Sequence, residues 1–128
     1  MAWAQSSLPP CPETGVKNLC FGSDSRDGAT RFGEFRSGML TGRGVLLFSD
    51  GRRYVGEFFR DQFEGDGILY GPDGNAIAIG YWSQGRLTNS VPHRFNELRN
   101  TFLEFERAST LTDTLGREAQ QVLAFTVQ

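Results

Sequence analysis

The chain has 128 residues, of which 38% are hydrophobic and 22% charged, and these figures suit one small globular domain. Its 13 Lys and Arg against 15 Asp and Glu give a net charge of −2, so it lacks the basic excess with which proteins hold nucleic acid or anionic membranes. One histidine and two cysteines leave few groups for a catalytic or zinc site, and we expect no enzyme activity, metal or cofactor.

The N-terminal segment, residues 1–20, indicates an exported protein. Ala2-Trp3-Ala4 has the small-x-small spacing of a signal peptidase site, although the apolar stretch that normally precedes such a site is missing. An ordinary frayed N-terminus is the alternative. The longest apolar runs, residues 44–48 and 77–82, are far shorter than the roughly 18 residues that span a bilayer. We therefore expect a periplasmic or secreted protein.

The two cysteines, Cys11 and Cys20, lie in a loop-like and proline-containing context. A disulfide between them would tie the N-terminal segment to the first strand and stabilise the fold by ~2 to 3 kcal/mol. Two thiols alone cannot complete a zinc site, and the only histidine, His93, lies far along the chain from either thiol. The sequence therefore predicts a Cys11–Cys20 disulfide, on the condition that the protein is exported.

Residues 21–88 contain an internal repeat of 23 residues. A shift of that length places Gly33-Glu34-Phe35 on Gly56-Glu57-Phe58, and Asp50-Gly51 on Asp73-Gly74. Glycines and apolar residues between these points coincide at the same shift. A partial unit precedes the two full repeats, and another follows them with one inserted residue.

Each repeat is predicted to form a β-hairpin. Alternating apolar residues mark the strands, and the Asp-Gly pairs mark turns because they tolerate positive φ. Gly56 and Gly67, inside the strands, leave room for an aromatic ring to lie flat across the sheet. The expected fold is mainly β, a twisted antiparallel meander with strands over residues 31–36, 43–48, 54–59, 66–70 and 76–82.

The motif Tyr54-x-Gly56-Glu57-Phe58, followed by Phe63-x-Gly65-x-Gly67, resembles the MORN repeat, the membrane occupation and recognition nexus motif. The prolines and cysteines of the N-terminal segment further resemble those of exported bacterial MORN proteins. Three residues depart from the pattern: Arg31 replaces the leading tyrosine, Asp61 replaces a mid-repeat glycine, and Ala78 replaces an aromatic residue. The resemblance implies an antiparallel sheet used as a scaffold or interaction surface, sometimes dimeric, with no catalytic residue in the repeat.

Residues 89–128 differ in composition, and glycine nearly disappears from them. Apolar residues at spacings of three and four predict an amphipathic helix over about residues 93–107, which would cap the sheet. A second short helix is expected over residues 113–122. Residues 123–128 either continue that helix or form an extended strand. The apolar stripe of the first helix is Phe95, Leu98, Phe102 and Phe105.

Apolar residues are expected on both faces of the sheet, since alternation points Phe58 one way and Val55 and Phe59 the other. A sheet of so few strands cannot leave two apolar faces in water. Either the helix covers one face and curvature closes the other, or one face docks a second copy or another protein. The predicted partner-binding row, if the helix leaves it open, is Phe32, Val55, Phe59, Ile79 and Tyr81.

The remaining polar residues are given structural roles. Glu34 and Glu57 share one repeat position, and we expect them to bond turn amides rather than to act as acid and base. Turn chemistry explains the aspartates that precede glycines, and no EF-hand loop is present, so no metal is predicted. His93 has no serine, cysteine or acid partner at a motif spacing.

The sequence therefore predicts a non-enzymatic protein–protein interaction or scaffold module of the bacterial envelope, with a protein partner or a homodimer. The alternative is a lipid-surface or envelope-binding module, which the family name suggests and the balanced charge disfavours. A basic patch on the folded surface would favour the lipid alternative, and a deep polar pocket would favour an enzyme.

Overall fold

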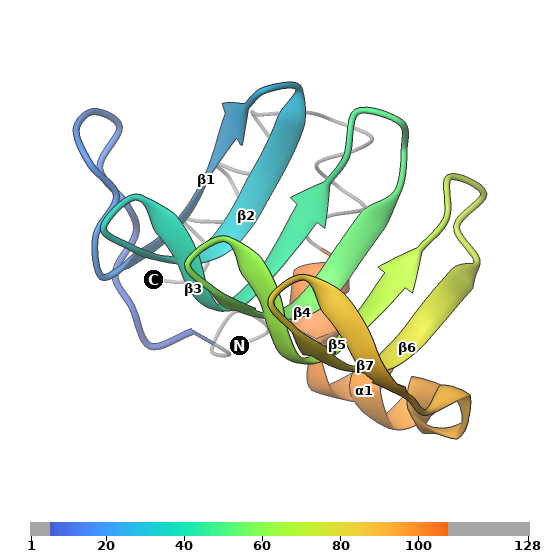
Figure 1. Ribbon diagram of the computed structural model, residues 1–128. Helices are drawn as coiled ribbons and strands as arrows, with labels where there is room; N and C mark the ends of the chain where they lie inside the picture. Colours follow the sequence, from blue (N-terminus) through green and yellow to red (C-terminus); the bar gives the residue numbers. More distant parts are fainter. Residues whose placement is uncertain (1–5, 108–128) are drawn as a thin grey trace.

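The computed structural model describes residues 6–107, so Ala2-Trp3-Ala4 and the elements expected over residues 113–128 lie outside the described residues. Within the described residues, seven strands form one antiparallel meander in which each strand pairs with the next along the chain (Figure 1). The expected fold class is confirmed. The strands are β1 (Cys20–Arg26), β2 (Ala29–Arg36), β3 (Met39–Leu47), β4 (Arg53–Phe59), β5 (Gln62–Tyr70), β6 (Ala76–Ser83) and β7 (Arg86–Ser90).

The outer strands β1 and β7 are missing from the predicted set. Both are rich in polar residues and lack apolar alternation, and they form because their backbones pair with β2 and β6. The strands β3 and β5 begin four residues earlier than predicted. Gly42 and Gly65, at φ +118° and +94°, interrupt the alternation that marks a strand in the sequence, but pairing continues past them.

A row of glycines crosses the sheet from β1 to β6. The Tyr54 ring lies against Gly67, where an added Cβ would stand 2.1 Å from the phenol oxygen. This confirms the expectation that Gly67 makes room for a ring. Strand pairing joins the row in the order Gly22, Gly33, Gly44, Gly56, Gly67 and Gly80.

Glu34 and Glu57 lie at bulges, where the register shifts between β2 and β3 and between β4 and β5. Their carboxylates accept the backbone N–H groups of Arg43 and Asp66, each at 2.7 Å. The expected structural role holds, but the expected partners were wrong, because these amides belong to the facing strands and not to turns. The carboxylate gives the facing amide an acceptor where the bulge disrupts the regular pairing.

The C-terminal helical segment covers one face of the sheet. A 3₁₀ turn, η2 (Pro92–Arg94), leads into α1 (Phe95–Thr101), and residues 103–107 are also helical (Figure 1). The helix predicted over residues 93–107 is therefore interrupted at Phe102. Three residues of its apolar stripe, Leu98, Phe102 and Phe105, are buried in one core of the sheet, and Phe95 is partly buried against it. The sheet contributes Phe21, Phe32, Val45, Val55 and Ile68 to this core.

The opposite face, here called the inner face, closes around a second core. This core contains Cys20, Phe35, Leu40, Tyr54, Phe58 and Trp82. Of the two arrangements expected for the apolar faces, the structure therefore shows the one in which the helix covers one face and the sheet closes on its own side chains at the other.

The N-terminal segment runs beside β1. Pro10 and Phe21 form a parallel bridge, the Cys11 N–H donates to the Phe21 carbonyl at 2.8 Å, and the Phe21 N–H donates to the Pro9 carbonyl at 2.7 Å. Cys11 and Cys20 form the predicted disulfide, with their Cα atoms 4.8 Å apart. Together these bonds hold residues 9–11 against the edge of the sheet.

The mid-repeat turns bond to one another in a regular series, here called the turn ladder. Each turn donates a backbone N–H to a carbonyl of the preceding unit: Gly38 to Lys17 at 2.7 Å, Asp61 to Leu40 at 2.9 Å and Gly85 to Phe63 at 3.0 Å. Lys17 belongs to no strand, so the loop before β1 supplies the acceptor that a preceding repeat would otherwise provide. The turn ladder thereby fixes the position of each repeat on the one before it.

We predict that Gly67→Ala lowers the free energy of unfolding by about 2 to 3 kcal/mol, because the new methyl group overlaps the Tyr54 ring. Urea denaturation followed by tryptophan fluorescence measures the change. Gly71→Ala is the matched control, since the nearest atoms to its Cβ would be 3.2 Å away or more, and its effect is expected to stay within ~1 kcal/mol. Equal losses for the two variants would contradict the role of the ring contact.

We predict that reducing the Cys11–Cys20 disulfide lowers the free energy of unfolding by about 2 to 3 kcal/mol, because the unfolded chain gains entropy. Denaturation with and without reductant measures the change, and a double Cys→Ser variant, which reductant cannot affect, is the control. Mass spectrometry after alkylation tests the bond directly. Two alkylated thiols in protein recovered from an oxidising compartment would contradict both the bond and the argument for export.

Candidate functional site

Aromatic rings fill the inner face in the second full repeat. Tyr54 stacks on Phe63 with ring centroids 3.7 Å apart and an interplanar angle of 5°, and Trp82 stands edge-on to both rings at 5.4 Å. The Tyr54 hydroxyl donates to the Glu57 carbonyl, and Trp82 Nε1 donates to the Gly67 carbonyl, each at 3.0 Å. Burial raises the pKa of Tyr54, so its hydroxyl stays protonated as a donor.

Arg31 takes the place of Tyr54 in the preceding repeat. Its Nε and Nη2 donate to the two carboxylate oxygens of Asp24, with Nε 2.7 Å from Oδ1. Its Nη1 lies 2.9 Å from both carboxylate oxygens of Asp61 and 3.1 Å from the Gly38 carbonyl. Hydrogen bonding to Asp24 raises the pKa of Arg31, so this buried guanidinium remains charged between two carboxylates.

Asp61 is the second departure from the repeat pattern, and it is bonded to the first. It occupies a mid-repeat turn at φ +67°, where two other repeats have glycine. Its carboxylate accepts from Arg31 and from the Leu40 N–H at 2.8 Å, and the Arg26 guanidinium lies 4.0 Å away. The sequence marked Arg31 and Asp61 as separate departures; the fold makes them one ion pair between adjacent repeats.

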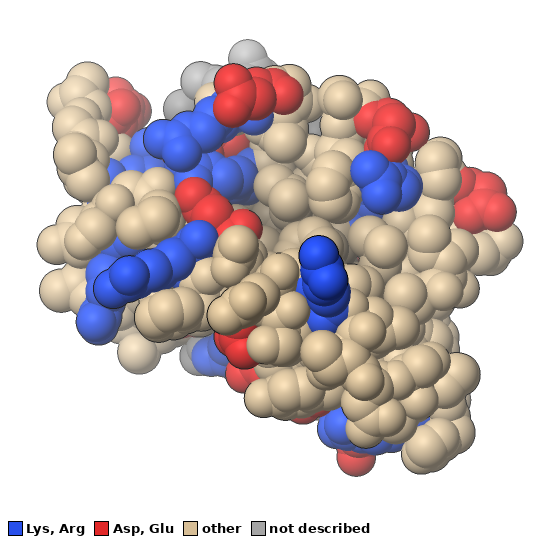
Figure 2. Space-filling model, in the orientation of Figure 1, with Lys and Arg blue, Asp and Glu red and all other residues tan. Residues whose placement is uncertain are grey.

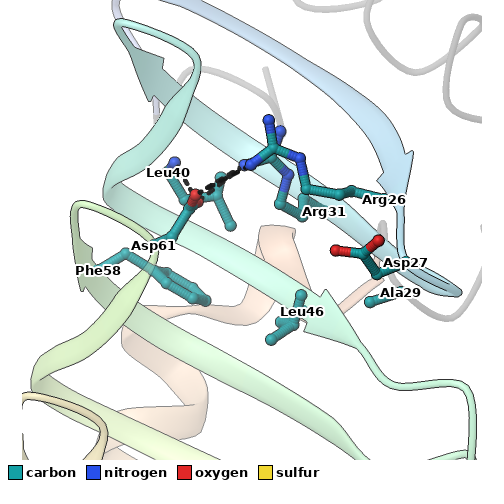
Figure 3. A pocket seen from close by; sticks show the side chains of 8 residues that line it. All are labelled: Arg26, Asp27, Ala29, Arg31, Leu40, Leu46, Phe58 and Asp61. Carbon is teal, nitrogen blue, oxygen red and sulfur yellow. Dashed lines mark hydrogen bonds and ion pairs between the residues drawn. The ribbon is translucent and has the colours of Figure 1, made fainter.

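A pocket opens beside this ion pair on the inner face (Figure 3). Its volume is about 240 Å³. Apolar side chains form much of its lining, and Figure 3 shows the Arg31–Asp61 bond along one side and the Asp27 carboxylate at another. The pocket is lined by Arg26, Asp27, Ala29, Arg31, Leu40, Leu46, Phe58 and Asp61. Sequence analysis did not identify this pocket, although two of its residues were the departures that signalled it.

The lining of the pocket suits binding. It consists only of Arg, Asp, Ala, Leu and Phe, so it offers no hydroxyl, thiol, imidazole or amine nucleophile. Arg31 and Asp61 use most of their hydrogen-bonding capacity on each other and on neighbouring groups. Among residues 6–107, no group of three or more His, Cys, Asp or Glu side chains is placed to hold a metal ion.

The structure divides the predicted partner-binding row. Phe32 and Val55 are buried beneath the helical segment, and Ile79 packs against the same core. Phe59 and Tyr81 are exposed, by 51% and 49%. The five residues therefore do not form one continuous exposed surface, and Phe59 and Tyr81 are its members on the outside of the described structure.

Basic and acidic side chains lie close together on the face shown in Figure 2. Ion pairs on the described residues join Arg52 to Asp50 at 2.8 Å and Arg26 to Asp61 at 4.0 Å. This face therefore lacks the basic patch that would favour a lipid surface as the partner. In residues 6–107, no helix is long and apolar enough to cross a membrane.

Comparison with protein families finds the MORN repeat in two segments, residues 32–52 and 54–76. These matches confirm the resemblance over the two full repeats. The first match starts just after Arg31, the residue that departs from the repeat pattern. No curated protein matches the chain. MORN repeats are in general non-enzymatic modules for protein or membrane interaction, and this is the functional class that the two matches support.

We predict that Arg31 and Asp61 are energetically coupled. Arg31→Tyr leaves the Asp61 carboxylate without its main partner, and each single variant, including Asp61→Gly, is expected to lose about 2 kcal/mol of stability. The double variant restores the repeat pattern. Its loss of stability is expected to be ~1 to 3 kcal/mol smaller than the sum of the losses in the two single variants.

Urea denaturation of the three variants gives this coupling. The exposed Arg52–Asp50 pair is the control, with an expected coupling below ~1 kcal/mol. Additive effects of Arg31→Tyr and Asp61→Gly would show that the two departures are independent.

Proposed function

We propose that the protein is a non-enzymatic interaction or scaffold module of the bacterial envelope, which binds a protein partner or a second copy of itself. The observation that carries this proposal is the exposure of two aromatic side chains, Phe59 and Tyr81, on a sheet held by the turn ladder and the disulfide. A preformed surface of this kind loses little conformational entropy on binding.

Charged residues lie next to both Phe59 and Tyr81. The Arg60 guanidinium lies 5.3 Å from the centre of the Phe59 ring, and Tyr81 pairs with Asp66, which also faces Arg94 at 3.4 Å. Aromatic and arginine side chains contribute most to the binding energy of protein interfaces. Phe59 and Tyr81 are therefore the residues of the predicted row that we assign to partner binding.

An envelope location is supported by the Cys11–Cys20 disulfide, since such bonds persist in oxidising compartments. The balanced charge and the mixed surface in Figure 2 favour a protein partner over a lipid surface. The functional class of the MORN repeat supports interaction over catalysis.

We predict that Phe59→Asp weakens self-association or capture of an envelope partner by ~2 kcal/mol or more, because a charge replaces an interface anchor. Sedimentation velocity and thermal melting are measured together, since loss of a fold contact lowers the melting temperature of a monomer instead. Val16→Asp is the matched control, because Val16 is 71% exposed in the N-terminal loop. Unchanged association and unchanged stability for Phe59→Asp would contradict the proposed surface.

A further inference from the structure

The pocket on the inner face lies where the next repeat holds an aromatic ring. In that repeat the Phe63 ring is stacked on Tyr54, edge-on to Trp82, and packed in one core with Leu69. Leu40 stands at the position of Phe63, so no ring takes the place of Phe63 in the first repeat. The ring that does lie against the Arg31 guanidinium, 5.2 Å away, is that of Phe35, which is the counterpart of Phe58. The pocket is lined by the counterparts of these four residues, which are Arg31, Phe58, Leu46 and Leu40 itself.

The size of the pocket fits a ring from outside the chain. An apolar cavity of ~150 Å³ in a protein interior accommodates benzene. The pocket here has a volume of about 240 Å³, which leaves room for a phenol or an indole group. Two of the residues that line it, Arg26 and Asp27, are exposed, so a side chain on another molecule can enter it.

The walls of the pocket favour an aromatic guest over an aliphatic one. The Arg31 guanidinium is a fixed plane, held by carboxylates on two sides, and a ring can stack on it as Phe63 stacks on Tyr54. Phe58 supplies a second aromatic contact, in the position from which Trp82 meets Phe63 edge-on. Leu46 completes the apolar lining.

The charged residues of the pocket select the polar group of the guest. Its two arginines and two aspartates balance, which favours a guest without net charge. Asp27 is exposed, and its carboxylate has no bonding partner among the described residues. An ionised carboxylate only accepts hydrogen bonds, so it favours a ring that carries a donor, as tyrosine and tryptophan do and phenylalanine does not.

We propose that this pocket binds a tyrosine or tryptophan side chain presented by a protein partner. The proposal rests on the proposed function as an interaction module, but it concerns a site separate from Phe59 and Tyr81. The guest ring takes the position of the missing Phe63 counterpart, between Arg31 and Phe58, and donates a hydrogen bond to Asp27.

The test is a titration of the full chain, labelled with ¹⁵N, with two probes that carry no charge, N-acetyl-tyrosinamide and N-acetyl-tryptophanamide. We expect saturable shifts at the Arg31 Nε–H and the Leu40 amide, with dissociation constants in the millimolar range. The Trp82 Nε1–H reports on the filled position in the next repeat and is expected not to shift. N-acetyl-leucinamide is expected to bind at least ~10-fold more weakly.

Two kinds of variant test the location of the probe. Leu40→Phe supplies the missing ring from within the chain and is expected to weaken probe binding at least ~10-fold. Leu46→Phe fills the pocket from its other side, and it replaces Leu40→Phe in this test if Leu40→Phe does not fold. Asp27→Ala, which removes the acceptor, is expected to remove the preference for tyrosine and tryptophan over N-acetyl-phenylalaninamide.

The failure of this proposal is distinguishable from the failure of the proposed function. Phe59→Asp changes the other surface and is expected to leave probe binding unchanged. Absence of saturable shifts, equal binding of the leucine probe, or full binding by Leu40→Phe would overturn the aromatic pocket. If partner capture is lost in Phe59→Asp while the probes never bind, the function stands and the pocket assignment falls. Shifts of the pocket resonances could also appear without any probe as the protein concentration rises. If these shifts vanish in Tyr81→Ala, the guest ring comes from a second copy of the chain, and the proposal of a different protein partner is overturned.

Discussion

The absence of side chains along the glycine row is the constraint on which the rest of the structure depends. A Cβ at Gly56 would stand 2.5 Å from the Asp66 carbonyl oxygen, and a Cβ at Gly80 would stand 2.0 Å from that of Asn89. Neighbouring backbones therefore approach along this row more closely than any side chain permits. The same gap receives the Tyr54 ring over Gly67, so one row of glycines allows both the close approach of the strands and the packing of rings on the inner face.

The stacking of the repeats decides which residues meet across them. Glutamates at the bulges bond the facing strands, and the turn ladder sets each turn on the one before it. Arg31 and Asp61, which are thirty positions apart, come within hydrogen-bonding distance because of this fixed offset. The loop before β1 and its disulfide end the series on one side, where Lys17 supplies the acceptor for the Gly38 N–H.

Two of the three departures from the repeat pattern, Arg31 and Asp61, coincide with the candidate site, while Ala78 lies outside it. Arg31 and Leu40 occupy positions where the next repeat has Tyr54 and Phe63, and the loss of two stacked rings leaves both a buried charge and a pocket. Asp61 supplies the charge that Arg31 requires, at the cost of positive φ at a residue other than glycine.

The sequence by itself determined the repeat length, the antiparallel meander, the cysteine pair and the apolar stripe of the helix, because each depends on residues close together in the chain or at a constant spacing. Only the tertiary structure decided that β1 and β7 are strands, since their pairing energy comes from neighbouring backbones. It also decided that Phe32 and Val55 are covered while Phe59 and Tyr81 are not, because alternation assigns a face but does not say how far a helix reaches across it. The pocket depends on the fold most of all, because the residues that line it come from four strands and two turns, and no single stretch of sequence contains them.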